Sequence, residues 1–203
     1  QALDRGEQTL DVLVRVREAG THPDGAARLD TGILELGVPT LGICLGLQTM
    51  VIEYARNVLG LVGASSSEFD ADPAHPVVAT MAEQLAIVGG EGDLGGTMRL
   101  GAYTAVLTEG SRISEIYGGA TEIEDRHRHR YEFNNRYREI FEANGMTFSG
   151  VSPDNRLVEI VEITDKKFFV GCQFHPELIS RPNRPQRLIK AFVGASLGEE
   201  IGE

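Results

Sequence analysis

The chain has 203 residues, of which 41% are hydrophobic and 24% are charged, and its formal net charge is −11. This length and composition predict one soluble domain over residues 1–203, with a core of its own. The acidic balance argues against a nucleic-acid partner recruited by overall charge. No apolar run approaches the roughly 20 residues of a membrane span, and no secretory signal opens the chain, so we expect no membrane partner. Two cysteines are too few for a disulfide framework.

The first 36 residues carry helical patterns and no motif. An amphipathic helix is predicted over residues 1–20, where apolar and charged side chains alternate at helical spacing. A turn at Thr21–Gly25 and a short second helix over residues 26–36 follow.

The next stretch reads as strand, sharp turn and helix. Residues 38–43 suit a short buried strand, and Gly42 and Gly46 flank Cys44 in a G-x-C-x-G pattern. Apolar residues then recur at helical spacing over residues 47–59 until Gly60, a plausible stop. This is the sequence form of a nucleophile elbow with cysteine as the nucleophile. A thiol there lies at a helix N-terminus, which favours the thiolate. The alternative is a buried, inert cysteine with incidental glycines.

The middle of the chain alternates loops, strands and one short helix. Glu68 lies in a loop over residues 61–72, and the glycine-rich stretch Gly89–Gly96 lacks the lysine of a phosphate-binding loop. Ser111 is a candidate N-cap for a helix that ends at Gly118. The predicted strands are residues 75–81, one entered within 94–101, and 101–107.

The densest cationic run, Arg126–Glu132, reads R-H-R-H-R-Y-E. It could bind phosphate or nucleic acid, and it makes a poor metal site because arginines repel a cation. It could also be a strand whose alternate side chains point to opposite faces, with the arginines on one face and the histidines on the other. We expect no metal site in the chain.

The C-terminal third is predicted to contain two helices and three strands. The third strand, residues 167–174, is mostly apolar and so central, and Cys172 within it is predicted to be a core residue. Residues 198–203 are predicted to be an acidic tail. The helices are residues 134–144 and 186–197, and the other strands are 148–151 and 157–163, the latter half-buried.

The sequence H-P-E directly follows the apolar strand. A thiol nucleophile requires a base, and the base requires an orienting carboxylate. His175 and Glu177 supply these two groups, so Cys44, His175 and Glu177 are the candidate catalytic residues. A catalytic thiol must stay reduced, which favours the cytoplasm.

G-I-C-L-G with a distant Q-F-H-P-E resembles the class I, or triad, glutamine amidotransferases. The stretches L-G-G-T-M-R-L-G from Leu94, R-H-R-H-R-Y-E from Arg126, and S-E-F from Ser67 resemble the amidotransferase domain of the CTP synthases. The resemblance runs from about Gly37 to about Leu197. Strands followed by helices imply an α/β fold with a central, largely parallel sheet flanked by helices, and site residues at the carboxyl ends of the strands; the resemblance implies the same architecture.

The resemblance implies hydrolysis of L-glutamine to glutamate and ammonia through a glutamyl thioester on Cys44. It implies that Leu45, Gln48, Glu68 and Arg130 bind glutamine: Leu45 through an oxyanion-binding N–H, Glu68 through the substrate ammonium, and Arg130 largely through its backbone. Thr97 and Arg99 are implied contacts for the effector GTP; the alternative for Arg99 is an exposed arginine on a β-hairpin.

The resemblance also implies a partner. In that family an amidoligase domain uses ATP and Mg²⁺ to aminate UTP to CTP, and the whole enzyme is a tetramer. We expect no cofactor in the present chain, which has no Walker-type loop.

One departure from the family pattern concerns residues 1–36. The family's first strand and its P-G-G-F-G loop, which supplies an oxyanion donor, are not found there, so this start is atypical or truncated. Losing one such donor costs about 100- to 1000-fold in rate. A silent glutamine-binding or scaffold module is therefore one alternative function. Another synthase's amidotransferase, which would share the triad, and a γ-glutamyl peptidase, which would share the Cys-His chemistry, are the others.

Overall fold

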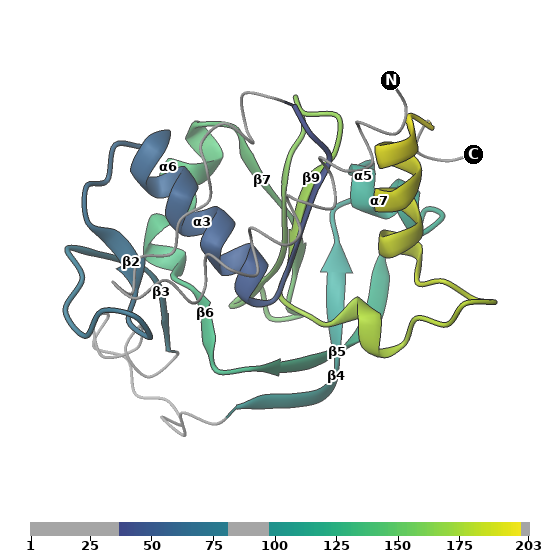
Figure 1. Cartoon of the computed structure of the whole chain (residues 1–203). Helices are drawn as coiled ribbons and strands as arrows, with labels where there is room; N and C mark the ends of the chain where they lie inside the picture. Colours follow the sequence, from purple (N-terminus) through teal and green to yellow (C-terminus); the bar gives the residue numbers. More distant parts are fainter. Residues whose placement is uncertain (1–36, 81–97, 200–203) are drawn as a thin grey trace.

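The computed structural model describes residues 37–80 and 98–199. The helices predicted over residues 1–36, the glycine-rich stretch Gly89–Gly96 and residues 200–203 lie outside the described residues. Within them, two sheets are each flanked by helices (Figure 1). The larger sheet has the strand order β1 (Thr40–Ile43), β9 (Phe169–Cys172), β8 (Val158–Ile163), β7 (Met146–Val151), β4 (Arg99–Leu107) and β5 (Glu122–His129). The smaller sheet has the order β2 (Ala64–Ser66), β3 (His75–Thr80) and β6 (Tyr131–Phe133).

The larger sheet is mixed. Strands β1 and β9 pair in parallel, whereas β9–β8, β8–β7, β7–β4 and β4–β5 all pair antiparallel. The α/β class is therefore as predicted, but the described strands do not form a largely parallel sheet. The reason is local: short turns join β7 to β8 and β8 to β9, and a short turn can connect only antiparallel neighbours.

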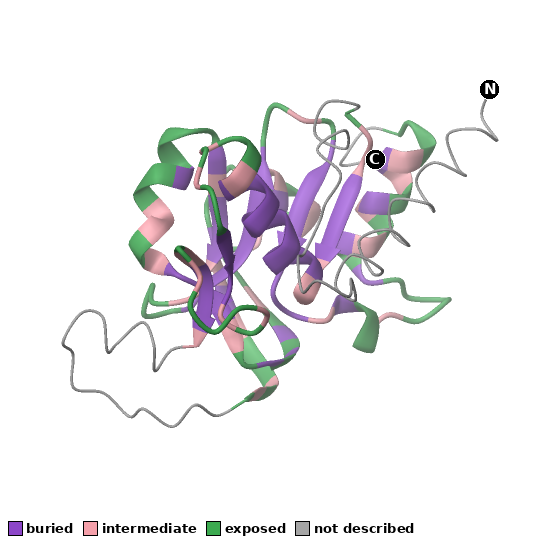
Figure 2. Ribbon diagram, turned by 60° about the vertical axis from the view of Figure 1, so that its left-hand side comes forward, coloured by how far each residue is buried: buried purple, intermediate pink, exposed green. Residues whose placement is uncertain are grey.

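Helices cover both faces of the larger sheet, so its central strands are buried on both sides (Figure 2). One core gathers α3 (Leu45–Asn57), α6 (Arg138–Ala143) and the smaller sheet around side chains such as Val161 and Phe169. The other gathers α5 (Arg112–Ile116) and α7 (Arg187–Leu197) around Ile160, Val170 and Cys172. Neighbouring residues of one strand thus enter different cores, as the two-residue repeat of a strand requires.

This double cover corrects the prediction for β8. A half-buried strand was expected over residues 157–163, but all six residues of β8 are buried, Glu159 and Glu162 included. The spacing of Val158, Ile160 and Ile163 around the two glutamates had suggested a solvent-facing side. Instead one of them, Glu159, is buried with Arg99 as its ion-pair partner. Cys172 is buried, as predicted.

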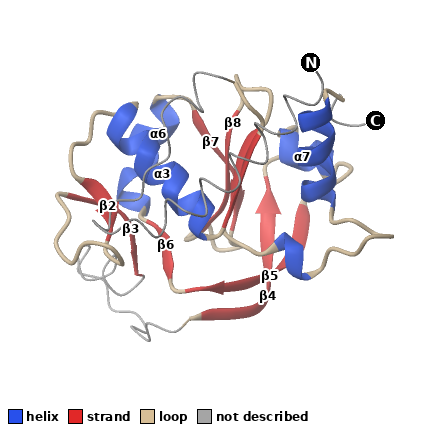
Figure 3. Cartoon of the chain, in the orientation of Figure 1, coloured by secondary structure: helices blue, strands red, loops and turns tan. Residues whose placement is uncertain are grey.

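The helices follow their sequence signals closely (Figure 3). Ser111 caps α5 by accepting a hydrogen bond from the Ser114 N–H, and Gln186 caps α7 in the same way from Leu188. Such a cap is worth about 1 kcal/mol. The helix predicted over residues 134–144 consists of a 3-10 turn, η1 (Asn135–Tyr137), followed by α6. Among the described helices, none combines the length and the hydropathy needed to cross a bilayer.

Candidate active site

Cys44 occupies a strained turn between β1 and α3. Its φ is 54° and its ψ is −104°, a conformation that L-residues rarely adopt outside functional sites. The flanking glycine is needed sterically, because a Cβ on Gly42 would lie 2.6 Å from the Met50 sulfur and 2.7 Å from the Gly46 carbonyl carbon. The strand, the turn and the helix therefore form the predicted nucleophile elbow.

The environment of the thiol differs from the sequence expectation. Burial raises the pKa of Cys44 to about 11, although the backbone N–H of Leu45 and the side chain of Gln173 both act to lower it. The helix N-terminus therefore does not by itself make this group a thiolate. At neutral pH the thiol carries its proton, and a base is required to remove it.

His175 and Glu177 are in position to form a base and its orienting group. The His175 Nδ1 lies 2.6 Å from the Glu177 Oε1, across Pro176 at the start of η2 (Pro176–Leu178). The His175 Nε2 is buried and makes no hydrogen bond within residues 37–80 and 98–199. A proton on Nδ1 leaves Nε2 with its lone pair, which is the form a general base needs.

The parallel strands bring the two halves of the site together. Ile43 of β1 is in register with Cys172 of β9, and the Cys44 N–H donates to the Cys172 carbonyl at 2.7 Å. Cys44 therefore leaves the carboxyl end of β1 beside the carboxyl end of β9, and His175 follows three residues after Cys172. The base and the nucleophile, far apart in sequence, belong to adjacent strand ends, where α/β sheets place their sites.

A cavity of about 330 Å³ opens at Cys44. All four residues predicted to bind glutamine line it together with the nucleophile: Leu45, Gln48, Glu68 and Arg130. Burial raises the pKa of Glu68, while nearby Arg130 lowers it. The cavity is also lined by four residues that no motif predicted to bind substrate: Met98, Arg128, His129 and Tyr131. The alternation in the Arg126–Glu132 run was the available signal for the last three.

The cationic run is an alternating strand that bends at Arg130. Arg126, Arg128 and Arg130 are exposed, whereas His127 and His129 are buried, so the structural interpretation of the run is correct. His127 packs against Tyr103 and Phe174, and burial lowers its pKa to about 2. No group of three or more His, Cys, Asp or Glu residues in the described part of the chain is arranged to hold a metal ion.

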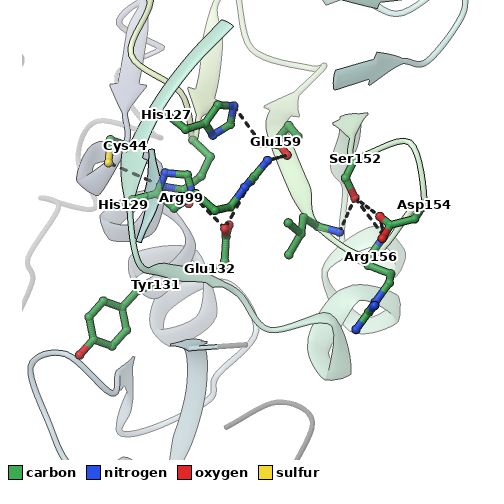
Figure 4. Close-up of polar contacts among 12 residues, drawn as sticks. Cys44, Arg99, His127, His129, Tyr131, Glu132, Ser152, Asp154, Arg156 and Glu159 are labelled. Carbon is green, nitrogen blue, oxygen red and sulfur yellow. Dashed lines mark hydrogen bonds and ion pairs between the residues drawn. The ribbon is translucent and has the colours of Figure 1, made fainter. Parts of the chain in front are cut away.

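The side chain of Arg99 is largely buried and forms ion pairs within the protein. Its guanidinium donates to the Glu159 carboxylate at 2.8 Å and to the Glu132 carboxylate at 3.3 Å, and Glu132 also pairs with His129 at 2.8 Å (Figure 4). Arg99 is thus not the exposed hairpin arginine considered as the alternative: 14% of its side chain is accessible. Thr97 lies outside the described residues, so its contact with an effector stays a prediction.

Comparisons with known proteins agree on one family. The family described as "Glutamine amidotransferase class-I" matches residues 19–195, so the similarity begins before Gly37. CTP synthases of Thermobifida fusca and Staphylococcus saprophyticus are 58% and 57% identical over 170 and 166 residues. These matches cover 83% and 82% of this chain but only 31% and 30% of the relatives, so the chain spans about a third of their length.

Solved structures give the same result. The glutaminase domain of Trypanosoma brucei CTPS with bound acivicin matches with a TM-score of 0.76 and 34% identity, over 84% of this chain and 64% of that one. A GMP synthase protein from Thermoplasma acidophilum, at 19% identity and a TM-score of 0.50, shares the fold; the match covers 83% of this chain and 62% of that one. With the elbow and the His–Glu pair on adjacent strand ends, the chain belongs to the class I glutamine amidotransferase family.

Proposed function

We propose that this chain is the glutaminase domain of a CTP synthase and hydrolyses L-glutamine to glutamate and ammonia. The observation that carries the proposal is the cavity at Cys44, lined by a carboxylate from Glu68 and by the cationic Arg130. A free amino acid carries an ammonium, which a carboxylate can bind, and a carboxylate, which a cationic group can bind. The similarity to curated CTP synthases selects that family among the amidotransferases.

In the first half-reaction, His175 Nε2 takes the thiol proton as the Cys44 sulfur attacks the side-chain amide carbon. The carbon–nitrogen bond then breaks, and the same proton passes from His175 to the departing nitrogen, which leaves as ammonia. Glu177 orients the ring through Nδ1 and stabilises its charged form. The Leu45 N–H at the start of α3 donates to the developing oxyanion.

In the second half-reaction, water attacks the glutamyl thioester. His175 accepts a proton from the water and returns it to the sulfur as the carbon–sulfur bond breaks, so glutamate leaves and the thiol is restored. Because the pKa of Cys44 is raised, the thiol is protonated at neutral pH, and His175 must remove the proton before the sulfur can attack.

The remaining parts of the proposal rest on the resemblance to the family. Ammonia would pass to an amidoligase domain that holds ATP, UTP and Mg²⁺, within a tetramer in the cytoplasm. GTP would act as the effector through Thr97 and Arg99. Because the guanidinium of Arg99 is held by Glu132 and Glu159, an effector at this residue would act on a buried ion-pair network that reaches His129 of the cavity wall.

A silent glutamine-binding module is the second candidate, favoured by the high pKa of Cys44. The test is release of glutamate and ammonia from L-glutamine by the purified chain, alone and with an amidoligase domain supplied. Hydrolysis that disappears in Cys44→Ala, with the fold retained, supports the enzyme. Glutamine binding without hydrolysis under both conditions supports the silent module.

A further inference from the structure

A buried glutamine touches the nucleophile. Gln173 is the first residue after β9 and has no exposed surface. Its side-chain Nε2 lies 3.7 Å from the Cys44 sulfur in hydrogen-bonding geometry. Figure 4 labels Cys44 and draws a dashed line from its sulfur. The parallel register of β1 with β9 accounts for the approach, because each residue directly follows its strand.

The neighbours of Gln173 fix which end of its amide faces the sulfur. The backbone carbonyl of Tyr131 can only accept, so the Gln48 Nε2, 2.9 Å away, must be the donor. The same nitrogen lies 3.5 Å from the Oε1 of Gln173. With its oxygen directed to Gln48, Gln173 presents its N–H group to Cys44. The orientation of the Gln173 amide therefore follows from the Tyr131 carbonyl, which fixes the Gln48 amide, which in turn fixes that of Gln173.

A donor in this place acts selectively on the ionised sulfur. A thiol sulfur is a weak acceptor, whereas hydrogen bonds to an ionised group are roughly twice as strong as neutral ones. The contact therefore strengthens when the proton leaves the sulfur, at the moment the nucleophile forms. The Leu45 N–H also donates to this sulfur, and in the proposed mechanism it turns to the oxyanion.

We propose that Gln173 is a further catalytic residue, whose side-chain N–H stabilises the Cys44 thiolate and is held in place by Gln48. Its link to turnover rests on the proposed glutaminase function. Gln173 gives up no proton: the thiol proton goes to His175 Nε2, and Gln173 only donates a hydrogen bond to the sulfur. Because Gln48 also lines the cavity, a substrate that contacts Gln48 touches the same amide chain.

The test is the pH dependence of Cys44 alkylation by iodoacetamide, followed by peptide mass spectrometry on the full chain without glutamine. Gln173→Met keeps the length of the side chain and removes the donor. Its alkylation pKa is expected to rise by about one unit, so that the rate below that pKa falls roughly tenfold. Gln48→Met, which removes the anchor and leaves Gln173, should give a smaller shift in the same direction.

A matched control separates this effect from damage to the fold. Gln186 is also a buried glutamine, but it bonds to Tyr117 and Asp125 instead of Cys44, so Gln186→Met should keep the parent profile. General loosening would expose the thiol and lower its pKa, the opposite of the predicted rise. An unchanged or lowered alkylation pKa in Gln173→Met overturns the inference. Absence of glutamine hydrolysis by the parent chain would instead remove the proposed function and leave this comparison intact.

Discussion

Cys44 and Cys172 are joined by a backbone hydrogen bond between adjacent strand ends, but their side chains differ in exposure. The N–H of Cys44 donates to the Cys172 carbonyl at 2.7 Å, yet Cys44 lines the cavity while the side chain of Cys172 is completely buried. The difference arises because Cys44 stands in the strained elbow and Cys172 lies within a strand that is covered on both faces. Chemistry directed at accessible thiols should therefore distinguish the two.

The hydrogen bond between His175 and Glu177 predicts a graded loss of activity. Glu177→Gln keeps the size of the side chain and removes the charge that orients and stabilises the imidazolium, so kcat should fall by roughly 100- to 10,000-fold while KM changes little. His175→Asn should abolish glutamate release. Steady-state glutamate production at several glutamine concentrations measures both. A Glu177→Gln enzyme with the parent's kcat would show that the pair has no role in the chemistry.

Glu68 is expected to act on binding. Replacing its carboxylate by an amide in Glu68→Gln removes the charge that would pair with the substrate ammonium, and we expect KM for glutamine to rise roughly 10- to 100-fold. Asp70→Asn is the matched control, because Asp70 is an exposed acid in the same loop and does not line the cavity. Equal changes in KM for the two variants would argue against a contact between Glu68 and substrate.

Arg99 is expected to stabilise the fold, whether or not it also contacts an effector. Arg99→Met leaves the buried carboxylates of Glu132 and Glu159 without their cationic partner and should cost about 3–5 kcal/mol of unfolding free energy. Arg128→Met, on the exposed face of the same hairpin, should change it by less than about 0.5 kcal/mol. Urea unfolding measures both. If the two variants proved equally stable, the ion-pair network would carry no net stability, and Arg99 could be tested directly for effector binding.

His127 predicts a loss of stability in acid. Its pKa is about 2 in the folded protein and about 6.5 when unfolded, so between these values the unfolded chain binds more protons. Stability supplied by the neutral ring is therefore complete above about pH 6.5 and is lost as the pH falls towards 2. In His127→Phe this part of the pH dependence should vanish, because phenylalanine has no group that titrates. The new ring can still pack against Tyr103 and Phe174, so the fold should be kept. Melting temperatures from pH 7 to pH 4 test it, and identical slopes for parent and variant would contradict the assignment.

The elbow and the order of elements were predictable because their signals are local. The glycines around Cys44 and the helical spacing after it lie within a few residues, and α3 forms where the pattern predicts it. The short strand β2 was predicted to be loop, because Ala64–Ser66 has no alternation and is held by pairing with β3. The single strand β4 was predicted in two parts that met at Gly101, where φ is +117° and pairing with His127 keeps the strand continuous.

Contacts between distant segments could not be predicted from the residues alone. Gln173 begins the Q-F-H-P-E stretch, but that motif predicted roles only for His175 and Glu177, and the contact of Gln173 with Cys44 becomes visible only when β1 and β9 pair. Arg99 likewise could be interpreted as exposed until Glu132 and Glu159 were found beside it. The largely parallel sheet was expected from strands followed by helices as well as from the family, and the short turns of this chain's C-terminal third contradict it for the described strands.

The most direct test of the central claim is mass spectrometry of the folded chain after treatment with a diazoketone analogue of glutamine. The account predicts one adduct, on Cys44, and its suppression by L-glutamine, because the analogue must occupy the cavity before the sulfur can attack it. Cys172 should remain unmodified, since its side chain is fully buried. An unmodified Cys44 in a folded sample, or an adduct that glutamine does not suppress, would contradict the claim that this cavity binds glutamine beside an activated thiol.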